Sequence, residues 1–154
     1  MGRAEASPKR RGARKQGSRL RGAEFRQILE EVLEDIDADE KAGSLLRAAG
    51  LRLRFRFPDL GTVLNIAPSE EAGHHLRWGF DDESGWDPRL ELVMDSDVAN
   101  AYLQGGESLA VAIARGRVKA RGDARYAMLY VPALRFVLDS YRRRVLAAHP
   151  HLAV

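Results

Sequence analysis

Alternating apolar and polar residues predict five β-strands in this chain. In residues 51–57, leucines and phenylalanines alternate with three arginines, which is the period of a strand buried on one face. Similar segments follow at 62–67, 74–80, 89–94 and 117–121. Because short connections join the first four segments, we expect a largely antiparallel meander with one face in water and the other covered by helices.

A different spacing of apolar residues predicts the helices. Residues 24–36 carry apolar side chains at i, i+3, i+4 and i+7 and carboxylates on the other side, which indicates an amphipathic helix. A short helix is expected at about 39–49. Two further short helices end at Gly105–Gly106 and at Gly116, because glycine tolerates the left-handed conformation that closes a helix. These elements together predict an α+β fold.

The last predicted helix, at about 124–147, is apolar nearly all round. Between Tyr126 and Leu138 the only charged residue is Arg135. A helix on a sheet needs a single apolar stripe, so this one must bury a second side against another helix, a partner subunit or an apolar ligand. Pro132 lies inside it and predicts a kink or a local break, since proline removes a backbone hydrogen bond.

The positive charge of the chain belongs to its first 22 residues. They hold eight Lys or Arg and one Glu, whereas residues 23–154 hold seventeen cations and twenty-one carboxylates, so the two parts carry net charges of +7 and −4. The 1–22 segment has almost nothing to bury, and we expect a disordered basic tail. It either attracts an anionic membrane or nucleic acid, or it is a solvated leader.

Composition narrows the function classes further. The 154 residues suffice for one domain with a core, and the absence of cysteine excludes disulfides, thiol nucleophiles and cysteine-based metal sites. No apolar run approaches the roughly 20 residues that span a bilayer, and neither a signal peptide nor a Ser-Lys-Leu ending is present, so we expect a cytoplasmic protein. Arginine supplies 21 of the 25 cations, which with the many alanines indicates a GC-rich bacterial genome.

Residues that often carry catalysis or bind metals occur only in weak patterns. His74 and His75 are adjacent, so on a strand they point to opposite faces and cannot chelate one metal. The acidic loop 81–88 lacks the spacing of a calcium-binding loop. The sequence contains no Gly-x-Ser-x-Gly elbow, phosphate loop or dinucleotide fingerprint. We therefore predict no enzyme activity, no metal and no cofactor.

The most informative stretch runs from Met94 to Asp123. It contains, in this order, an acidic helix start, a Gly-Gly break, a short helix and a strand segment. The strand segment reads Gly116-Arg117-Val118-Lys119-Ala120-Arg121-Gly122-Asp123. In this order these elements resemble the sterol carrier protein type 2 family, over roughly residues 38–146, with Ile113 where many relatives have an aromatic residue. The resemblance implies a five-stranded, mainly antiparallel sheet covered on one face by helices, with an apolar tunnel between them. It also implies non-catalytic binding and transfer of a fatty acid, acyl-CoA, phospholipid or sterol-like lipid.

Candidate wall residues of this tunnel combine inward side chains of the sheet and of the later helices. From the strands they are Phe55, Leu64, Trp78, Phe80, Leu92 and Met94, and from the helices Tyr102, Leu109, Ile113, Met128, Leu129 and Phe136. Each is also a candidate for plain core, because both roles require the same chemistry. Trp86, in the acidic loop, is a candidate for the tunnel mouth. The cations of 117–121 either meet a ligand head group or form a solvated strand edge.

These expectations divide the chain into four parts: a basic tail (1–22), an amphipathic helix (23–37), a lipid-binding domain (38–148) and a short tail (149–154). Two rival functions remain open. One is a protein-interaction module that uses the apolar last helix. The other is binding of nucleic acid or an anionic surface through the Arg-rich tail, with nucleic acid the less favoured partner. Because relatives occur fused to enzymes, such a chain could also serve an enzyme in trans.

Overall fold

The computed structural model describes residues 22–123, 125–126 and 130–154. Its helices are the N-terminal helix (residues 22–38), α2 (Glu40–Ala48), α3 (Ser96–Leu103), α4 (Leu109–Ala114) and α5 (Val131–Ala148), with a 3₁₀ turn, η2, at Pro150–Leu152. The strands are β1 (Leu53–Phe57), β2 (Thr62–Pro68), β3 (Leu76–Phe80), β4 (Leu90–Met94) and β5 (Val118–Gly122). The predicted α+β fold is confirmed. The predicted basic tail, apart from Gly22, lies outside the described residues.

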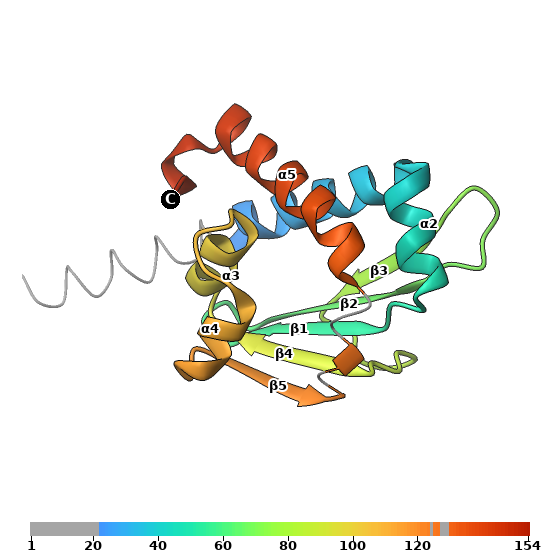
Figure 1. Cartoon of the computed structure of the whole chain (residues 1–154), viewed down its shortest axis with the longest axis horizontal. Coiled ribbons are helices and arrows are strands. Elements are labelled where there is room, and N and C mark those ends of the chain that lie inside the picture. Colours follow the sequence, from blue (N-terminus) through green and yellow to red (C-terminus); the bar gives the residue numbers. More distant parts are fainter. Residues whose placement is uncertain (1–21, 124, 127–129) are drawn as a thin grey trace, which may run out of the picture.

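The five strands form one mixed sheet in the order β3-β2-β1-β4-β5 (Figure 1). The β1–β4 pair is parallel, and the other pairs are antiparallel. The prediction of a mainly antiparallel sheet is confirmed, but the predicted meander is wrong at one step, because β4 pairs with β1 and not with β3. The connection 81–89 is long enough to take the chain from the β3 edge past β2 to the other side of β1.

This connection is held on the outer face of the sheet, the face away from the helices. Glu83 forms ion pairs with Arg54 (3.3 Å) and Arg56. The amide of Asn65 donates to the carbonyl of Asp82 (2.9 Å). The arginines that alternate along β1 therefore have a structural partner in the acidic loop, and their side chains lie opposite the apolar ones because strand side chains alternate between faces.

Figure 1 shows α2 and α5 over the other face of the sheet, with α3 and α4 at one end of it. The N-terminal helix buries the apolar stripe that its period predicts: Phe25, Ile28, Val32 and Ile36 are each at most 4% exposed. The ring of Phe25 meets that of Phe57 edge to face, with 5.2 Å between the centroids. This helix therefore packs directly on the end of β1.

Helix α5 buries part of its second side against other helices. Tyr141 is fully buried and donates to Asn100 of α3 (2.7 Å). Asp35 of the N-terminal helix accepts from Ser140 (2.8 Å) and from Arg144 (2.6 Å). The Arg144 hydrogen bond is the main reason that the pKa of Asp35 lies below its ordinary value. The sequence left open whether the second apolar side of this helix meets another helix, a partner subunit or a ligand. Contacts with other helices cover part of that side.

Helix α5 begins later than predicted. Its first two residues are Val131 and Pro132, and proline is well tolerated there because the N–H groups of a first turn have no partner inside the helix. Of the predicted kink or local break at Pro132, the kink is not found, whereas a break agrees with an α-helix that starts only at Val131, after the 3₁₀ residues 125–126 and 130. At the other end, Asn100 and Gln104 both donate to the carbonyl of Leu152 (2.9 Å each), which fixes η2 against α3.

Candidate functional site

The strand side chains that face the helices form one apolar surface. The register sets Phe55 of β1 between Leu64 of β2 and Leu92 of β4. Because side chains alternate between the faces of a sheet, residues two apart along a strand share this face. All six strand residues predicted for a tunnel wall therefore lie together on it: Phe55, Leu64, Trp78, Phe80, Leu92 and Met94. All six belong to the buried apolar cluster or pack against it.

The middle of this surface keeps accessible apolar area. β1 is the central strand, yet its inward side chains Leu53 and Phe55 are only half-buried, whereas Phe57 is 1% exposed. The flanking side chains Leu64 and Leu92 are buried. An inward aromatic residue on the central strand is normally among the best covered of a domain. Leu53 and Phe55 are therefore the centre of the candidate site.

The helix residues predicted for the wall have mixed positions. Phe136 and Leu109 pack against the apolar cluster and are half-buried. Tyr102 is also half-buried, and burial raises the pKa of its hydroxyl. Ile113 is 39% exposed, so only part of its side chain faces the space between the sheet and the helices. The remaining two predicted residues, Met128 and Leu129, lie outside the described residues.

Three half-buried members of the same surface were missed by the sequence prediction. Leu53 lies two residues before Phe55 on the same face of β1, and Tyr130 and Val137 come from the start of α5. The alternation of 51–57 could have identified Leu53. Tyr130 and Val137 lie in the stretch whose excess of apolar residues was noted, but only the path of α5 shows that they meet the cluster.

A pair of tyrosines brings polar groups to this surface. The hydroxyl of Tyr126 donates to the carbonyl of Gly50 and accepts from the N–H of Arg52 (3.0 Å), which ties the segment before α5 to the start of β1. The ring of Tyr130 meets that of Tyr126 edge to face at 5.1 Å. Burial, and next to it the neighbouring Tyr126 hydroxyl, raise the pKa of Tyr130, whose own hydroxyl oxygen is buried.

Trp86 does not lie where it was predicted. A Cβ atom on Gly79 would be 3.0 Å from the Trp86 ring, and the guanidinium of Arg77 lies 4.3 Å from the centre of that ring. On β3, Trp78 packs against the apolar cluster, so its neighbours Arg77 and Gly79 face the other way. Trp86 contacts both of these residues and therefore lies on the outer face. Trp86 therefore cannot line the mouth of a space between sheet and helices.

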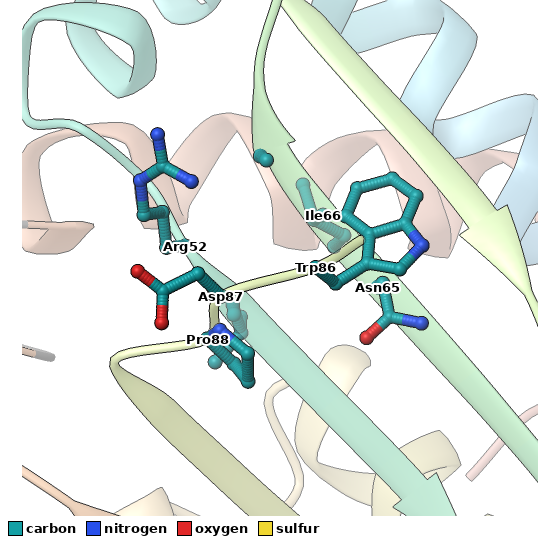
Figure 2. Close-up of a pocket in the computed structure, with 8 residues that line it drawn as sticks. Arg52, Asn65, Ile66, Trp86, Asp87 and Pro88 are labelled. Atoms are coloured by element: carbon teal, nitrogen blue, oxygen red, sulfur yellow. The ribbon is translucent and has the colours of Figure 1, made fainter. Parts of the chain in front are cut away.

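The depression beside Trp86 is not a binding site. It is lined by residues of β1, β2 and the 81–89 connection (Figure 2): Arg52, Leu53, Asn65, Ile66, Ala67, Trp86, Asp87 and Pro88. It is too shallow to enclose even a water molecule. The wide apolar face on the helix side is the better candidate.

The two adjacent histidines lie just before β3 and do not point to opposite faces of it. Nδ1 of His74 lies 2.6 Å from the carboxylate of Asp37, and Nε2 of His75 lies 3.1 Å from that of Glu40. Although burial opposes it, hydrogen bonds from His74 and from the N–H groups of His75 and Leu76 lower the pKa of Asp37. Asp37 in turn raises the pKa of His74. These pairs fasten the end of the N-terminal helix and the start of α2 to β3.

The described residues offer neither a metal site nor a membrane-spanning helix. In the ranges 22–123, 125–126 and 130–154, no group of three or more His, Asp or Glu side chains is placed to hold a metal ion. Within the same ranges, no helix has both the length and the apolar character needed to cross a membrane. What gathers on the helix-covered face is apolar surface.

Solved structures of similar fold exist, although no family model and no curated protein matches the chain. The chain is similar to the UbiJ-SCP2 ubiquinone synthesis protein, with 16% identity over 77% of this chain and 98% of that one and a TM-score of 0.55. It is also similar to a sterol carrier protein 2, with 13% identity over 75% of this chain and 94% of that one and a TM-score of 0.52.

The chain further matches a small part of two sec-alkyl sulfatase structures, one of them from Pseudomonas sp.. It spans 13% and 14% of their lengths, and the second match has 15% identity over 59% of this chain and a TM-score of 0.50. At these identities the matches establish the fold. The chain has the fold of sterol carrier protein 2, as the resemblance in the sequence predicted.

Proposed function

We propose that this chain binds an apolar lipid between the helix-covered face of its sheet and the helices, and transfers it without chemical change. The observation that carries the proposal is the half-buried pair Leu53 and Phe55 on the central strand, beneath helices that leave them accessible. The similarity to sterol carrier protein 2 supports the same function. The cargo classes that fit are a fatty acid, an acyl-CoA, a phospholipid or a sterol-like lipid.

The chemistry of the site suits a lipid. An acyl chain gains about 0.8 kcal/mol for each methylene group that leaves water, so a long chain binds apolar walls tightly without any charged residue. We propose a wall made of Leu53, Phe55, Leu64, Trp78, Phe80, Leu92, Met94, Tyr102, Leu109, Tyr130, Phe136 and Val137. Ile113 is left out because it lies on the exposed side of α4, and Met128 and Leu129 stay predictions from the sequence.

The two tryptophans allow a direct test, because they lie on opposite faces of the sheet. The Trp86→Phe variant keeps Trp78, on the apolar face, as the only reporter, and the Trp78→Phe variant keeps Trp86, on the outer face. A fatty acid brominated along its chain quenches tryptophan only at close range. We expect it to quench Trp78 at saturation and to leave Trp86 unchanged. Equal quenching of both, or of neither, would contradict the proposed site.

Mass spectrometry of the freshly purified protein, native and after organic extraction, identifies the cargo. A stoichiometric fatty acid or phospholipid would support the proposal and name the class. A protein that carries no lipid and whose Trp78 does not respond to added lipids would remove the carrier function. We further propose a cytoplasmic, non-catalytic carrier of a bacterial cell, which hands its cargo to an enzyme or a membrane.

A further inference from the structure

Helix α4 exposes apolar side chains to solvent on an end of the molecule. Of its large residues, Val111 is 41% exposed and Ile113 is 39% exposed, and Ala110 and Ala114 are exposed beside them. The opposite side of the helix is fixed, because Ala112 is fully buried and Leu109 packs against the apolar cluster. A six-residue helix with no polar side chain thus has one side in the core and one in water.

Cations follow this exposed side directly. Residues 108–122 contain four cations and no carboxylate. The side chain of Arg115 is 66% exposed, that of Arg117 45% and that of Arg121 67%, and Lys119 is also exposed. Arg115 (3.9 Å) and Arg117 (2.7 Å) share one carboxylate, that of Glu107, so the three groups together keep a net positive charge. Arg121 pairs with Glu91 (3.3 Å).

We propose that the α4 surface (Ala110, Val111, Ile113 and Ala114, with Arg115 and Arg117) docks on an anionic lipid bilayer. Small aliphatic side chains can enter the boundary between head groups and acyl chains, while adjacent cations attract anionic head groups. The inference goes beyond the proposed function, since it concerns the outer surface of α4 and not the space between the sheet and the helices. If the chain also carries lipid, docking would bring Leu109, on the buried side of α4, close to the membrane.

The same features argue against a protein partner at this surface. A stable protein interface buries about 800 Å² on each partner and is rich in tyrosine, tryptophan and methionine. The exposed apolar side of α4 comes from a helix of six residues and contains only Ala, Val and Ile. A bilayer requires no complementary shape, so a small apolar surface flanked by cations is sufficient.

The test uses the absence of cysteine from the chain. The Ile113→Cys variant is labelled with an environment-sensitive fluorophore and mixed with vesicles of phosphatidylcholine alone or of equal parts phosphatidylcholine and phosphatidylglycerol. Leu146→Cys is the matched control, because Leu146 is an exposed apolar residue (58%) of α5. We expect a blue shift at position 113 with the anionic vesicles, a much smaller one with neutral vesicles, and none at position 146.

A charge variant checks the electrostatic part. Arg115→Glu with Arg117→Glu should weaken co-sedimentation with anionic vesicles about tenfold or more, because each basic residue near such a surface contributes on the order of 1 kcal/mol. The matched control, Arg142→Glu with Arg143→Glu, changes the same charges on the exposed side of α5 and should bind as the unmodified chain does. Circular dichroism verifies that both variants are folded.

Three outcomes would overturn the docking surface. One is a chain that does not sediment with anionic vesicles. Another is a chain that sediments while the label at position 113 stays unchanged, which would assign binding to another part such as the 1–22 segment. The third is a blue shift at 113 that appears on concentration without vesicles, which would assign α4 to a second copy of the chain. Mass spectrometry of co-purified lipid remains independent of all three.

Discussion

At the scale of single residues, Gly122 shows how closely the backbone of β4 and β5 is packed. Its φ angle is +106°, and a Cβ atom built on it would lie 2.2 Å from the carbonyl oxygen of Arg89. Gly116 also has a positive φ, +75°, but a Cβ there would have no atom within 4 Å. The two glycines therefore separate the cost of a clash from the cost of the backbone conformation alone.

We expect Gly116→Ala to lower the free energy of unfolding by about 1–2 kcal/mol, the cost of a left-handed conformation for alanine. Gly122→Ala adds a backbone clash and should cost about 3 kcal/mol or more. Urea denaturation followed by circular dichroism measures both. Equal costs for the two substitutions would show that β4 and β5 separate easily at Gly122.

Asp37 is a second residue whose role depends on its partners. Its carboxylate accepts from the N–H groups of His75 (2.7 Å) and Leu76 (2.9 Å). Asp37→Asn keeps the size but removes the charge, and we expect a loss of about 1–3 kcal/mol in the free energy of unfolding. Asp139→Asn, at an exposed position of α5, is the control and should change stability little. A similar effect of both would indicate a general charge effect.

At the scale of elements, carboxylate–histidine pairs hold the N-terminal helix at both ends. Asp37 binds His74 at one end, and Glu24 binds His149 and His151 at the other. Burial alone would raise the pKa of Glu24. The hydrogen bonds from the two histidines outweigh this effect, so the pKa lies below its ordinary value. The pKa of Asp37 is also lowered and that of His74 is raised.

These shifts predict a stability maximum at mildly acidic pH. A carboxylate with a lowered pKa contributes stability above its ordinary value of about 4 and loses it as the pH falls. His74, with a raised pKa, contributes below about 6.5 and loses its contribution as the pH rises through its folded value. We therefore expect the highest Tm between about pH 4.5 and 6.5.

Thermal denaturation across the pH range measures this profile. His74→Gln should reduce the decline on the alkaline side. The acidic decline should become smaller but remain, because Glu24 keeps its two histidines and Asp37 keeps the N–H groups of His75 and Leu76. A variant whose profile equals that of the unmodified chain on the alkaline side would show that the His74 pair contributes nothing to stability.

The elements also show what the sequence could and could not predict. Strong local periods identified the strand of 51–57 and the N-terminal helix, because each has one apolar side. The partner of β4 could not be predicted, since the choice between β3 and β1 depends on the route of the 81–89 connection. The same route decides the face on which Trp86 lies. Pro132 was ambiguous, because proline signals a kink inside a helix and a normal start at its first turn.

For the candidate site, the alternation rule correctly gathered six strand residues on one face. It could not show which of them keep accessible area, because that depends on how α5 and its neighbours cover the sheet. Phe55 and Leu64 have the same chemistry and neighbouring positions, yet the first is half-buried and the second 1% exposed. Tertiary contacts, and not the residue type, decide which of two such side chains stays accessible.

At the scale of the whole molecule, a bound lipid should stabilise the fold. A ligand that binds only the folded chain, at a free concentration 100 times its Kd, adds about 2.7 kcal/mol to the free energy of unfolding. For a chain of this size we expect a rise in Tm on the order of 5–10 °C. Differential scanning fluorimetry with a long-chain fatty acid, and with butyrate as the short control, measures it. An equal shift with both acids would indicate a salt effect.

The parallel pairing of β1 with β4 also has a consequence for how the protein folds. β1, β2 and β3 follow one another through short connections and can pair at small entropic cost, whereas β4 and β5 join only after longer segments have closed. Pulse-labelled hydrogen exchange should therefore protect the amides of β2 before those of β5. Until β4 adds, the side chain of Phe55 has an open flank, so a lipid present during refolding should load faster than one offered to the finished protein.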